Sequence, residues 1–328
     1  MDFDNLFHRL LQLKVAVIGD VMLDTYWWGM VDRISPEAPV PVVVVSKKEQ
    51  RIGGAGNVAL NARALAANVS LISVLGKDDE GEQLVKLLQQ NHINTNYMVQ
   101  SEKRITTNKI RIISRNQQMM RLDAELATDL EKKDEENLLF AFENYMAAEE
   151  PDVVILEDYN KGVLTDCVIT AIIKLCKKHN VIVTVDPKRK NFFSYKEVDV
   201  FKPNLKEALE SLNLLKESIS LNMLRDIHIL LEEKLSHHIS LITLSEKGIF
   251  FQDENQGGVI PTHIRNVSDV SGAGDTVIAV AALVYTATKD IKLMTEIANI
   301  AGGMVCEEVG TVAIDKKKLL EECKHLMT

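Results

Sequence analysis

After Asp129 the chain alternates between short apolar segments and longer amphipathic ones, and no other feature of the sequence restricts the fold as strongly. The short segments have the length and β-branched content of strands, and the longer ones have the apolar spacing of helices. Strands are predicted at 153–156, 181–185, 198–201, 239–244 and 258–264, and helices at 130–146, 165–179, 205–212, 221–234, 277–285, 292–306 and 316–325. This alternation predicts an α/β fold with a mostly parallel sheet that is covered by helices on both faces.

Polar side chains follow the predicted strands at their carboxyl ends, which is where α/β proteins bind ligands. Asp20 and Asp24 follow a buried strand predicted at Lys14–Gly19 and could accept hydrogen bonds from sugar hydroxyls, although a capped turn would use the same residues. The later strands are followed by Glu157 and Asp158, by Asp186 and Lys188, by Asn204 and Glu207, and by Ser245 and Lys247. Four such groups in succession favour a ligand site at this edge of the sheet.

A second, smaller sheet is predicted from two segments that do not fit the alternation. Residues 26–46 contain three prolines and then a run of four valines. In the segment 105–122, residues 105–113 are β-branched and polar together, and residues 119–122 indicate another short strand. The second segment and its surroundings are locally basic, with Lys109, Arg111, Arg115, Asn116 and Arg121. These charges indicate either a solvated face or a site for the anionic part of a substrate.

Two glycine-rich segments precede predicted helices. Residues 53–57 (Gly-Gly-Ala-Gly-Asn) open a helix predicted at 58–67, and residues 269–276 (Asp-Val-Ser-Gly-Ala-Gly-Asp-Thr) open the helix at 277–285. Glycines at a helix start let an anion approach the free backbone N–H groups, although structural turns use glycine in the same way. Asp275 could cap the helix or favour its dipole, or it could accept a proton from a hydroxyl that attacks phosphorus.

The composition restricts the partners and the compartment. The 328 residues contain 38 Lys and Arg against 47 Asp and Glu, so the formal net charge is −9, which argues against a broad nucleic-acid or anionic membrane surface. The four cysteines show no Cys-x-x-Cys spacing, and no apolar stretch reaches membrane-spanning length. We therefore expect a cytoplasmic protein with reduced thiols and no signal peptide.

Together the two glycine-rich motifs resemble those of the ribokinase-like (PfkB) sugar kinases. The resemblance covers nearly the whole chain, and within the family it is strongest to the kinases of D-glycero-β-D-manno-heptose 7-phosphate. The further matching segments are 19–24, 33–42, 114–118, Asp158-Tyr159 with Lys161-Gly162, and 203–207.

Two residues depart from the pattern of the family. They are Ser271, where Thr is frequent, and Glu157, where the heptose-phosphate kinases carry Ser. Relatives often carry a fused nucleotidyltransferase domain, and its His-x-Gly-His motif is absent, so we expect one kinase domain over 1–328 with a β lid at about 26–46 and 105–122.

The resemblance implies ATP and Mg²⁺ as cofactors and a role for each matching residue. Asp275 would be the general base, and the N–H groups of Gly272, Ala273 and Gly274 would stabilise the transferred phosphoryl group. The nucleotide would contact Asn204, Leu205, Lys206, Glu207, Ser245, Lys247, Gly248, Asn299 and Gly303, with Asn204 and Glu207 placing Mg²⁺ indirectly. The sugar phosphate would contact Asp20, Asp24, Gly53, Gly54, Asn57, Lys109, Arg115, Asn116, Asp158, Lys161 and Lys188.

The resemblance therefore implies phosphorylation of the heptose 7-phosphate at O1, a step toward ADP-heptose for the lipopolysaccharide core, by a homodimer joined through its lids. One alternative is the same chemistry on another sugar, sugar phosphate or nucleoside. A second is a regulator that binds a sugar or nucleotide without catalysis, which the presence of Asp275 disfavours.

Overall fold

The computed structural model describes residues 2–65, 68–115, 117–215, 219–263 and 265–327. Its main sheet has eight strands, and all neighbours from β12 to β4 are parallel, whereas β13 and β14 are added antiparallel at one edge. The order is β14 (Gly257–Ile260), β13 (Ile249–Gln252), β12 (Ile239–Thr243), β11 (Val200–Phe201), β10 (Ile182–Asp186), β9 (Val153–Glu157), β1 (Lys14–Gly19) and β4 (Asn68–Ile72). The prediction of a mostly parallel sheet is confirmed.

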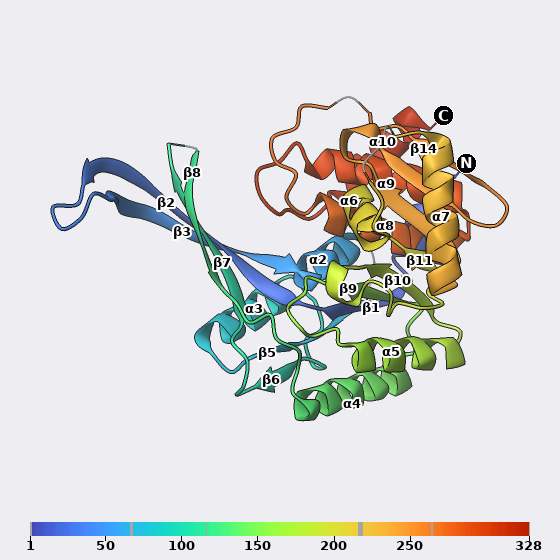
Figure 1. Ribbon diagram of the computed structural model, residues 1–328, viewed down its shortest axis with the longest axis horizontal. Helices are drawn as coiled ribbons and strands as arrows, with labels where there is room; N and C mark the ends of the chain where they lie inside the picture. The colour runs from blue at the N-terminus through green and yellow to red at the C-terminus, as the bar shows by residue number, and fades with distance from the viewer. Residues whose placement is uncertain (1, 66–67, 116, 216–218, 264, 328) are drawn as a thin grey trace.

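Helices pack on both faces of this sheet and give the protein two hydrophobic cores, as predicted (Figure 1). Strand β1 shows the reason, because Val15 and Val17 enter one core while Ala16 and Ile18 enter the other. The first core contains α1 (Phe3–Leu10), α2 (Ala55–Leu65), α3 (Asp79–Gln90), α8 (Ala273–Thr288), α9 (Ile291–Val305) and α10 (Lys316–Leu326). The second contains α4 (Lys132–Glu149), α5 (Asp166–Lys178), α6 (Leu205–Ser211) and α7 (Leu221–Leu235).

The lid is a separate four-stranded sheet that projects from the body of the protein (Figure 1). Its strands lie in the order β3 (Pro41–Gly54), β2 (Val21–Ile34), β7 (Thr107–Ser114) and β8 (Gln117–Ala124). Strands β2 and β3 span 21–54 and extend the predicted range 26–46 at both ends. Strands β7 and β8 span 107–124, so they begin and end slightly later than the predicted range 105–122. The first pair is longer than predicted because β2 follows almost directly after β1 and because β3 leads directly into α2. The polarity of the residues at these junctions does not reveal this continuity.

Several smaller elements differ from the prediction. A two-stranded sheet formed by β5 (Val74–Gly76), which comes directly after β4, and β6 (Val99–Ser101) was not predicted. Short 3₁₀ turns cover Arg189–Asn191 and Ser245–Lys247. Strand β14 ends at Ile260 rather than at the predicted residue 264. A longer irregular segment than predicted therefore separates this strand from the glycine-rich turn before α8. In the described part of the chain, no helix is long and apolar enough to cross a membrane.

Candidate active site

The N-terminus of α8 forms the centre of the site. Gly272 is the N-cap and adopts a left-handed conformation with φ of 80°, which allows the chain to turn into the helix at Ala273. A Cβ atom at this position would lie 2.8 Å from Asn57 Nδ2, so glycine is required for the close approach of α2 and α8. The first turn of the helix leaves backbone N–H groups without intrahelical partners, and its dipole favours an anion there.

Asp275 lies in this first turn and is almost fully buried, with 3% of its surface exposed. Both of its carboxylate oxygens are held, because Asn57 Nδ2 donates to Oδ2 at 2.7 Å and the Tyr159 hydroxyl donates to Oδ1 at 2.7 Å. Burial raises the pKa of Asp275, while these two hydrogen bonds lower it and leave a smaller net rise. A buried carboxylate with fixed orientation and an elevated pKa is suited to accept a proton.

Asn57 is itself fixed by its neighbours on α2 and α8. Asn61 Nδ2 donates to the Asn57 backbone oxygen at 2.9 Å, and Asn61 Oδ1 accepts from the Thr276 hydroxyl at 3.1 Å. The same Asn61 oxygen accepts from the Ile314 backbone at 2.9 Å. Helix α2, which the glycine-rich residues 53–57 open, therefore packs directly against α8 and carries Asn57, the partner of Asp275.

A cavity of about 770 Å³ opens beside the N-terminus of α8. Its lining comes from the carboxyl ends of β10 to β12, from α8 and from α9, which is the edge where the sequence predicted a ligand site. Residues from the predicted nucleotide and phosphoryl sites in this lining are Asn204, Glu207, Ser245, Gly248, Gly272, Ala273, Gly274, Asp275, Asn299 and Gly303. Among the described residues, Leu205, Lys206 and Lys247 were predicted for the nucleotide but do not line the cavity.

Two lysines neutralise a buried aspartate on the floor of this cavity. Asp186, at the end of β10, contacts Lys202 Nζ at 2.7 Å and Lys188 Nζ at 3.2 Å. Burial would raise the pKa of Asp186, but the charges of the two lysines outweigh burial and lower it. Lys188 also contacts Glu207 Oε1 at 2.9 Å. Lys188 thus lines the same cavity as the residues predicted for the nucleotide, although the sequence predicted a contact with the sugar phosphate.

Asn204 and Glu207 form a capping box at the start of α6. Glu207 Oε2 accepts from the Asn204 backbone at 2.8 Å, and Asn204 Oδ1 accepts from the Glu207 backbone at 2.8 Å. Since Glu207 Oε1 also contacts Lys188, these oxygens are already engaged in the protein. Among the described residues there is no group of three or more acidic, His or Cys side chains that could hold a metal directly.

The far end of the cavity lies between α9 and the segment before α8. Asn299 Nδ2 donates to the Pro261 backbone oxygen at 2.8 Å, which fixes that segment against the helix. Gly303 faces Arg265, and a Cβ atom there would lie 3.0 Å from its Nε. Arg265 is held in turn by Glu322 at 2.6 Å and Glu307 at 3.3 Å.

The predicted sugar-binding residues lie between the lid and the carboxyl end of β1. Asp20 is buried and accepts three backbone hydrogen bonds, from Tyr159 at 2.8 Å, from Lys161 at 2.9 Å and from Val163 at 3.0 Å. Its carboxylate therefore shapes the loop after β9. Asp24 pairs with Arg111 of the neighbouring lid strand, and Gly53 packs against the Asp24 carboxylate.

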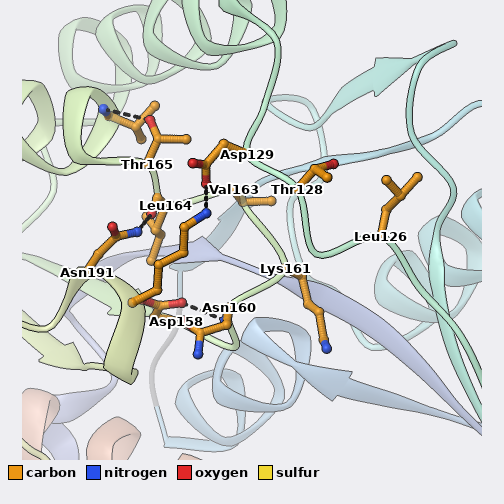
Figure 2. A network of polar contacts seen from close by, with 12 residues as sticks. Leu126, Thr128, Asp129, Asp158, Asn160, Lys161, Val163, Leu164, Thr165 and Asn191 are labelled. Atoms are coloured by element: carbon orange, nitrogen blue, oxygen red, sulfur yellow. Dashed lines mark hydrogen bonds and ion pairs between the residues drawn. The ribbon is translucent and has the colours of Figure 1, made fainter.

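The loop after β9 is held by a polar network that Figure 2 shows in part. Asp158 accepts from the Asn160 backbone at 2.7 Å and from the Tyr195 hydroxyl at 2.7 Å, and burial raises the pKa of Asp158 to about 6. Asn191 Nδ2 donates to the Leu164 backbone oxygen at 2.7 Å on the far side of the loop (Figure 2). Asp158 thus supports the loop that carries Tyr159 and Lys161.

Glu157 is the buried residue at the end of β9, and neither of its carboxylate oxygens has a hydrogen-bond partner among the described residues. Burial raises its pKa well above the ordinary value, and the nearby charges of Asp186 and Asp275 raise it further. Burial and these two charges therefore favour the protonated form of the Glu157 side chain. This is the position at which the sequence departs from the heptose-phosphate kinases.

The basic residues predicted for the substrate phosphate are not gathered in one place. Lys109 lies on β7 with its ammonium 5.3 Å from the centre of the Tyr159 ring, and Lys161 contacts Glu125 at 2.7 Å close by. Arg115 instead lies at the exposed tip of the β7–β8 hairpin, 3.5 Å from Asp32. Asn116 lies outside the described residues.

Two residues of the site were missed in the sequence. Tyr159 carries no periodic signal, although it stands inside the Asp158-Tyr159 motif. Lys202 directly follows β11 and comes two residues before Asn204 in the chain. The pattern of polar residues after the strands could therefore have identified Lys202 as a site residue as well.

The sequence matches the pfkB family of carbohydrate kinases over residues 12–318. The chain belongs to this family. It is 38% identical over 318 residues to the bifunctional protein HldE of Sulfurimonas denitrificans, covering 96% of this chain and 65% of that one. It is 40% identical over 310 residues to the bifunctional protein HldE of Aliarcobacter butzleri, and the match covers 94% of this chain and 64% of that protein. The pfkB domain described here therefore spans somewhat less than two thirds of the length of these relatives.

Solved structures of pfkB kinases share the fold. Phosphofructokinase-2 from Escherichia coli in complex with potassium superposes with a TM-score of 0.80 at 16% identity, over 97% of this chain and all of the other. Ribokinase of Arabidopsis thaliana, complexed with ribose and ATP, superposes with a TM-score of 0.73 at 16% identity over 94% of this chain and 99% of the other. The ribokinase-like fold is thereby confirmed. Family membership makes the protein a sugar kinase and implies ATP as its phosphoryl donor.

Proposed function

We propose that this kinase phosphorylates D-glycero-β-D-manno-heptose 7-phosphate at O1 with ATP and forms the 1,7-bisphosphate, a step toward ADP-heptose for the lipopolysaccharide core. The observation that carries the proposal is the buried Asp275 carboxylate at the N-terminus of α8, fixed by Asn57 and Tyr159 beside a cavity of nucleotide size. The motifs shared with the heptose-phosphate kinases and the similarity to the HldE proteins support the choice of sugar. Because ATP and reduced thiols fit that compartment, we place the reaction in the cytoplasm.

In the proposed reaction Asp275 accepts the proton of the sugar O1 hydroxyl while O1 attacks the γ-phosphorus in line. The bond from O1 to phosphorus forms as the bond from phosphorus to the β,γ-bridging oxygen breaks, and ADP leaves. The backbone N–H groups of Gly272 and Gly274 would stabilise the anionic phosphoryl group at the positive end of α8, whereas that of Ala273, also predicted for this role, donates to the Val270 oxygen at 3.3 Å. Lys188 and Lys202 line the cavity and attract the nucleotide phosphates.

Mg²⁺ would enter with ATP and neutralise charge on its phosphates. The candidate residues are Asn204 and Glu207, whose oxygens line the cavity but are engaged in the capping box and with Lys188. An oxygen donor set suits Mg²⁺, and a metal that keeps several of its waters fits residues that offer no free oxygen for direct contact. We therefore assign them a water-mediated role, in agreement with the sequence prediction.

The acceptor sugar would lie under the lid, on the opposite side of Asp275 from the nucleotide. Asn57 would contact sugar hydroxyls together with the glycines of the 53–57 segment, and Asp24 would do so from the lid strand. Asp20 and Asp158 would act through the loop whose backbone they hold. Closure of the lid would exclude water, which otherwise competes as the acceptor.

Lys109 is the residue we propose for the distal phosphate of the acceptor, with Lys161 beside it. Burial lowers the pKa of Lys109, and the charge of Lys161 lowers it further, although the charge of Asp24 opposes this shift. An anion bound at Lys109 would stabilise its charged form. No ion pair to Lys109 occurs among the described residues. Lys161 and Arg115 both have acidic partners, so they are weaker candidates for this role.

Substitution of Lys109 by Met should raise the KM for the heptose 7-phosphate by about 10–100-fold without changing the KM for ATP, because one charged hydrogen bond to the phosphate is lost. Lys188→Met is the matched control and should raise the KM for ATP instead. Initial rates of ADP release with the heptose phosphate and with the unphosphorylated heptose provide the measurement. Equal rates of the native enzyme with both sugars would contradict a phosphorylated acceptor.

We further propose that two copies of the chain pair through their lids. Strand β8 lies in the lid that projects from the body of the protein (Figure 1). It is exposed at every position, and the lid carries exposed apolar side chains that include Met30, Val44 and Met120. A projecting sheet with an unpaired edge and apolar residues in water is a surface that another sheet covers. Met120→Glu should convert a dimer into a monomer in sedimentation equilibrium, and a monomeric native protein would refute the pairing.

A further inference from the structure

Tyr159 contacts the reacting centre in a way that the proposed function does not yet use. Its hydroxyl donates to Asp275 Oδ1 at 2.7 Å, and its ring lines the nucleotide cavity. Two ammonium groups lie near the same ring, Lys109 of the lid at 5.3 Å and Lys188 of the core at 5.6 Å from its centre. Tyr159 is thus in contact with the base, the lid and the nucleotide side of the site.

We infer that Tyr159 is a positioning residue that orients the Asp275 carboxylate for proton transfer and links that orientation to the lid through Lys109. This inference rests on the proposed role of Asp275 as general base. With Tyr159 on Oδ1 and Asn57 on Oδ2, the carboxylate cannot rotate, so its remaining lone pairs have one fixed direction. Fixed orientation of a base is a large part of its catalytic effect.

The phenol is suited to this role because it remains a donor over the whole working pH range. Burial raises the pKa of Tyr159 well above the ordinary value, and the neighbouring charge of Asp275 raises it further. The lid reaches the ring through strand β7, on which Lys109 lies. A cation over an aromatic face attracts the ring, so a lid that moves Lys109 away would release one of the two groups that clamp the phenol.

The pH dependence of the reaction reports on this contact. Several titratable or charged groups surround Asp275, namely Tyr159 and Glu157 at the end of β9, Asp186 at the end of β10, and Lys202 after β11. Among them, Tyr159 is the one whose hydrogen bond stabilises the ionised form of Asp275. Its removal raises the pKa of the base, and activity is then lost at a higher pH on the acid side.

The test is the pH profile of kcat/KM for Tyr159→Phe, measured by ADP release with ATP and the heptose 7-phosphate. We expect kcat to fall by about 10–100-fold. We also expect the acid limb of the profile, which is the pH range where activity is lost on acidification, to move up by about one pH unit. Tyr195→Phe is the matched control, because it removes an equally short hydroxyl bond from the carboxylate of Asp158. The control should leave the acid limb where it is.

A second replacement keeps the test independent of folding. 3-Fluorotyrosine at position 159 is a stronger donor of almost the same size and should move the acid limb to lower pH. An unchanged acid limb in both replacements would overturn the inference. If the heptose phosphate is not turned over, the same profiles are measured with the best acceptor among fructose 6-phosphate, ribose and adenosine. Full activity of Asp275→Asn would refute the base itself, whereas loss of activity there with no effect at Tyr159 would refute the positioning role alone.

Discussion

Replacement of Asp275 by Asn should lower kcat by about 10²–10⁴-fold, the range in which a positioned general base contributes. The amide has the same shape and can still accept the hydroxyl of Tyr159, but its NH₂ group then faces Asn57 Nδ2, so the Asn57 amide must turn over to keep this contact. What is lost is the group that takes the proton of the attacking hydroxyl. Single-turnover rates of ADP release measure this step without the contribution of product release.

The control for Asp275→Asn is the affinity for ATP, because the carboxylate lies at the edge of the nucleotide cavity but its proton affinity is not needed for binding. Thermal unfolding and ATP binding should both stay near the native values. Near-native turnover of a folded variant would mean that another group, or water, removes the proton.

Substitution of Lys202 by Met should have the largest effect on stability that we predict, a loss of about 3–5 kcal/mol in the free energy of unfolding. Lys202 and Asp186 are both buried, with Nζ and Oδ2 only 2.7 Å apart. Removal of the ammonium leaves Asp186 with Lys188 as its remaining ion-pair partner among the described residues, and with the buried Glu157 side chain nearby. Urea unfolding followed by circular dichroism measures the change.

Lys177→Met provides a matched control for Lys202→Met. Lys177 pairs with Glu197 at 2.6 Å, but both side chains are about half exposed, so water screens the pair. Its loss should change the free energy of unfolding by about 0–1 kcal/mol. Equal effects of the two substitutions would show that the charges around Asp186 are not needed for the fold.

The main sheet could be predicted because its strands are short and apolar on both faces, and because the helices α5, α6 and α8 follow β9, β11 and β14. Strand β13 at Ile249–Gln252 was missed, because its four residues follow a turn so closely that no separate apolar run stands out. Strand β3 was recognised only in its valine run. Its second half, Ser46–Arg51, is entirely polar or charged and becomes a strand through pairing with β2.

The candidate site was predicted to a similar extent and for similar reasons. A glycine pair before a helix specifies local backbone geometry, so the position of Asp275 at a helix N-terminus followed from neighbouring residues alone. The assignment of the lysines could not follow in this way. Whether Lys188 contacts Glu207 or Lys109 contacts Tyr159 depends on how the lid and separate strands pack, which no local pattern encodes.

The central claim, transfer of the γ-phosphoryl group of ATP to O1 of the heptose 7-phosphate, is tested most directly by identification of the product. The enzyme is incubated with ATP, Mg²⁺ and D-glycero-β-D-manno-heptose 7-phosphate, and the mixture is followed by ³¹P nuclear magnetic resonance. We predict one new phosphomonoester coupled to the anomeric proton, formed in equal amount with ADP and formed far more slowly with Asp275→Asn. Transfer to another hydroxyl or to water, or turnover only with a different sugar, would contradict the account.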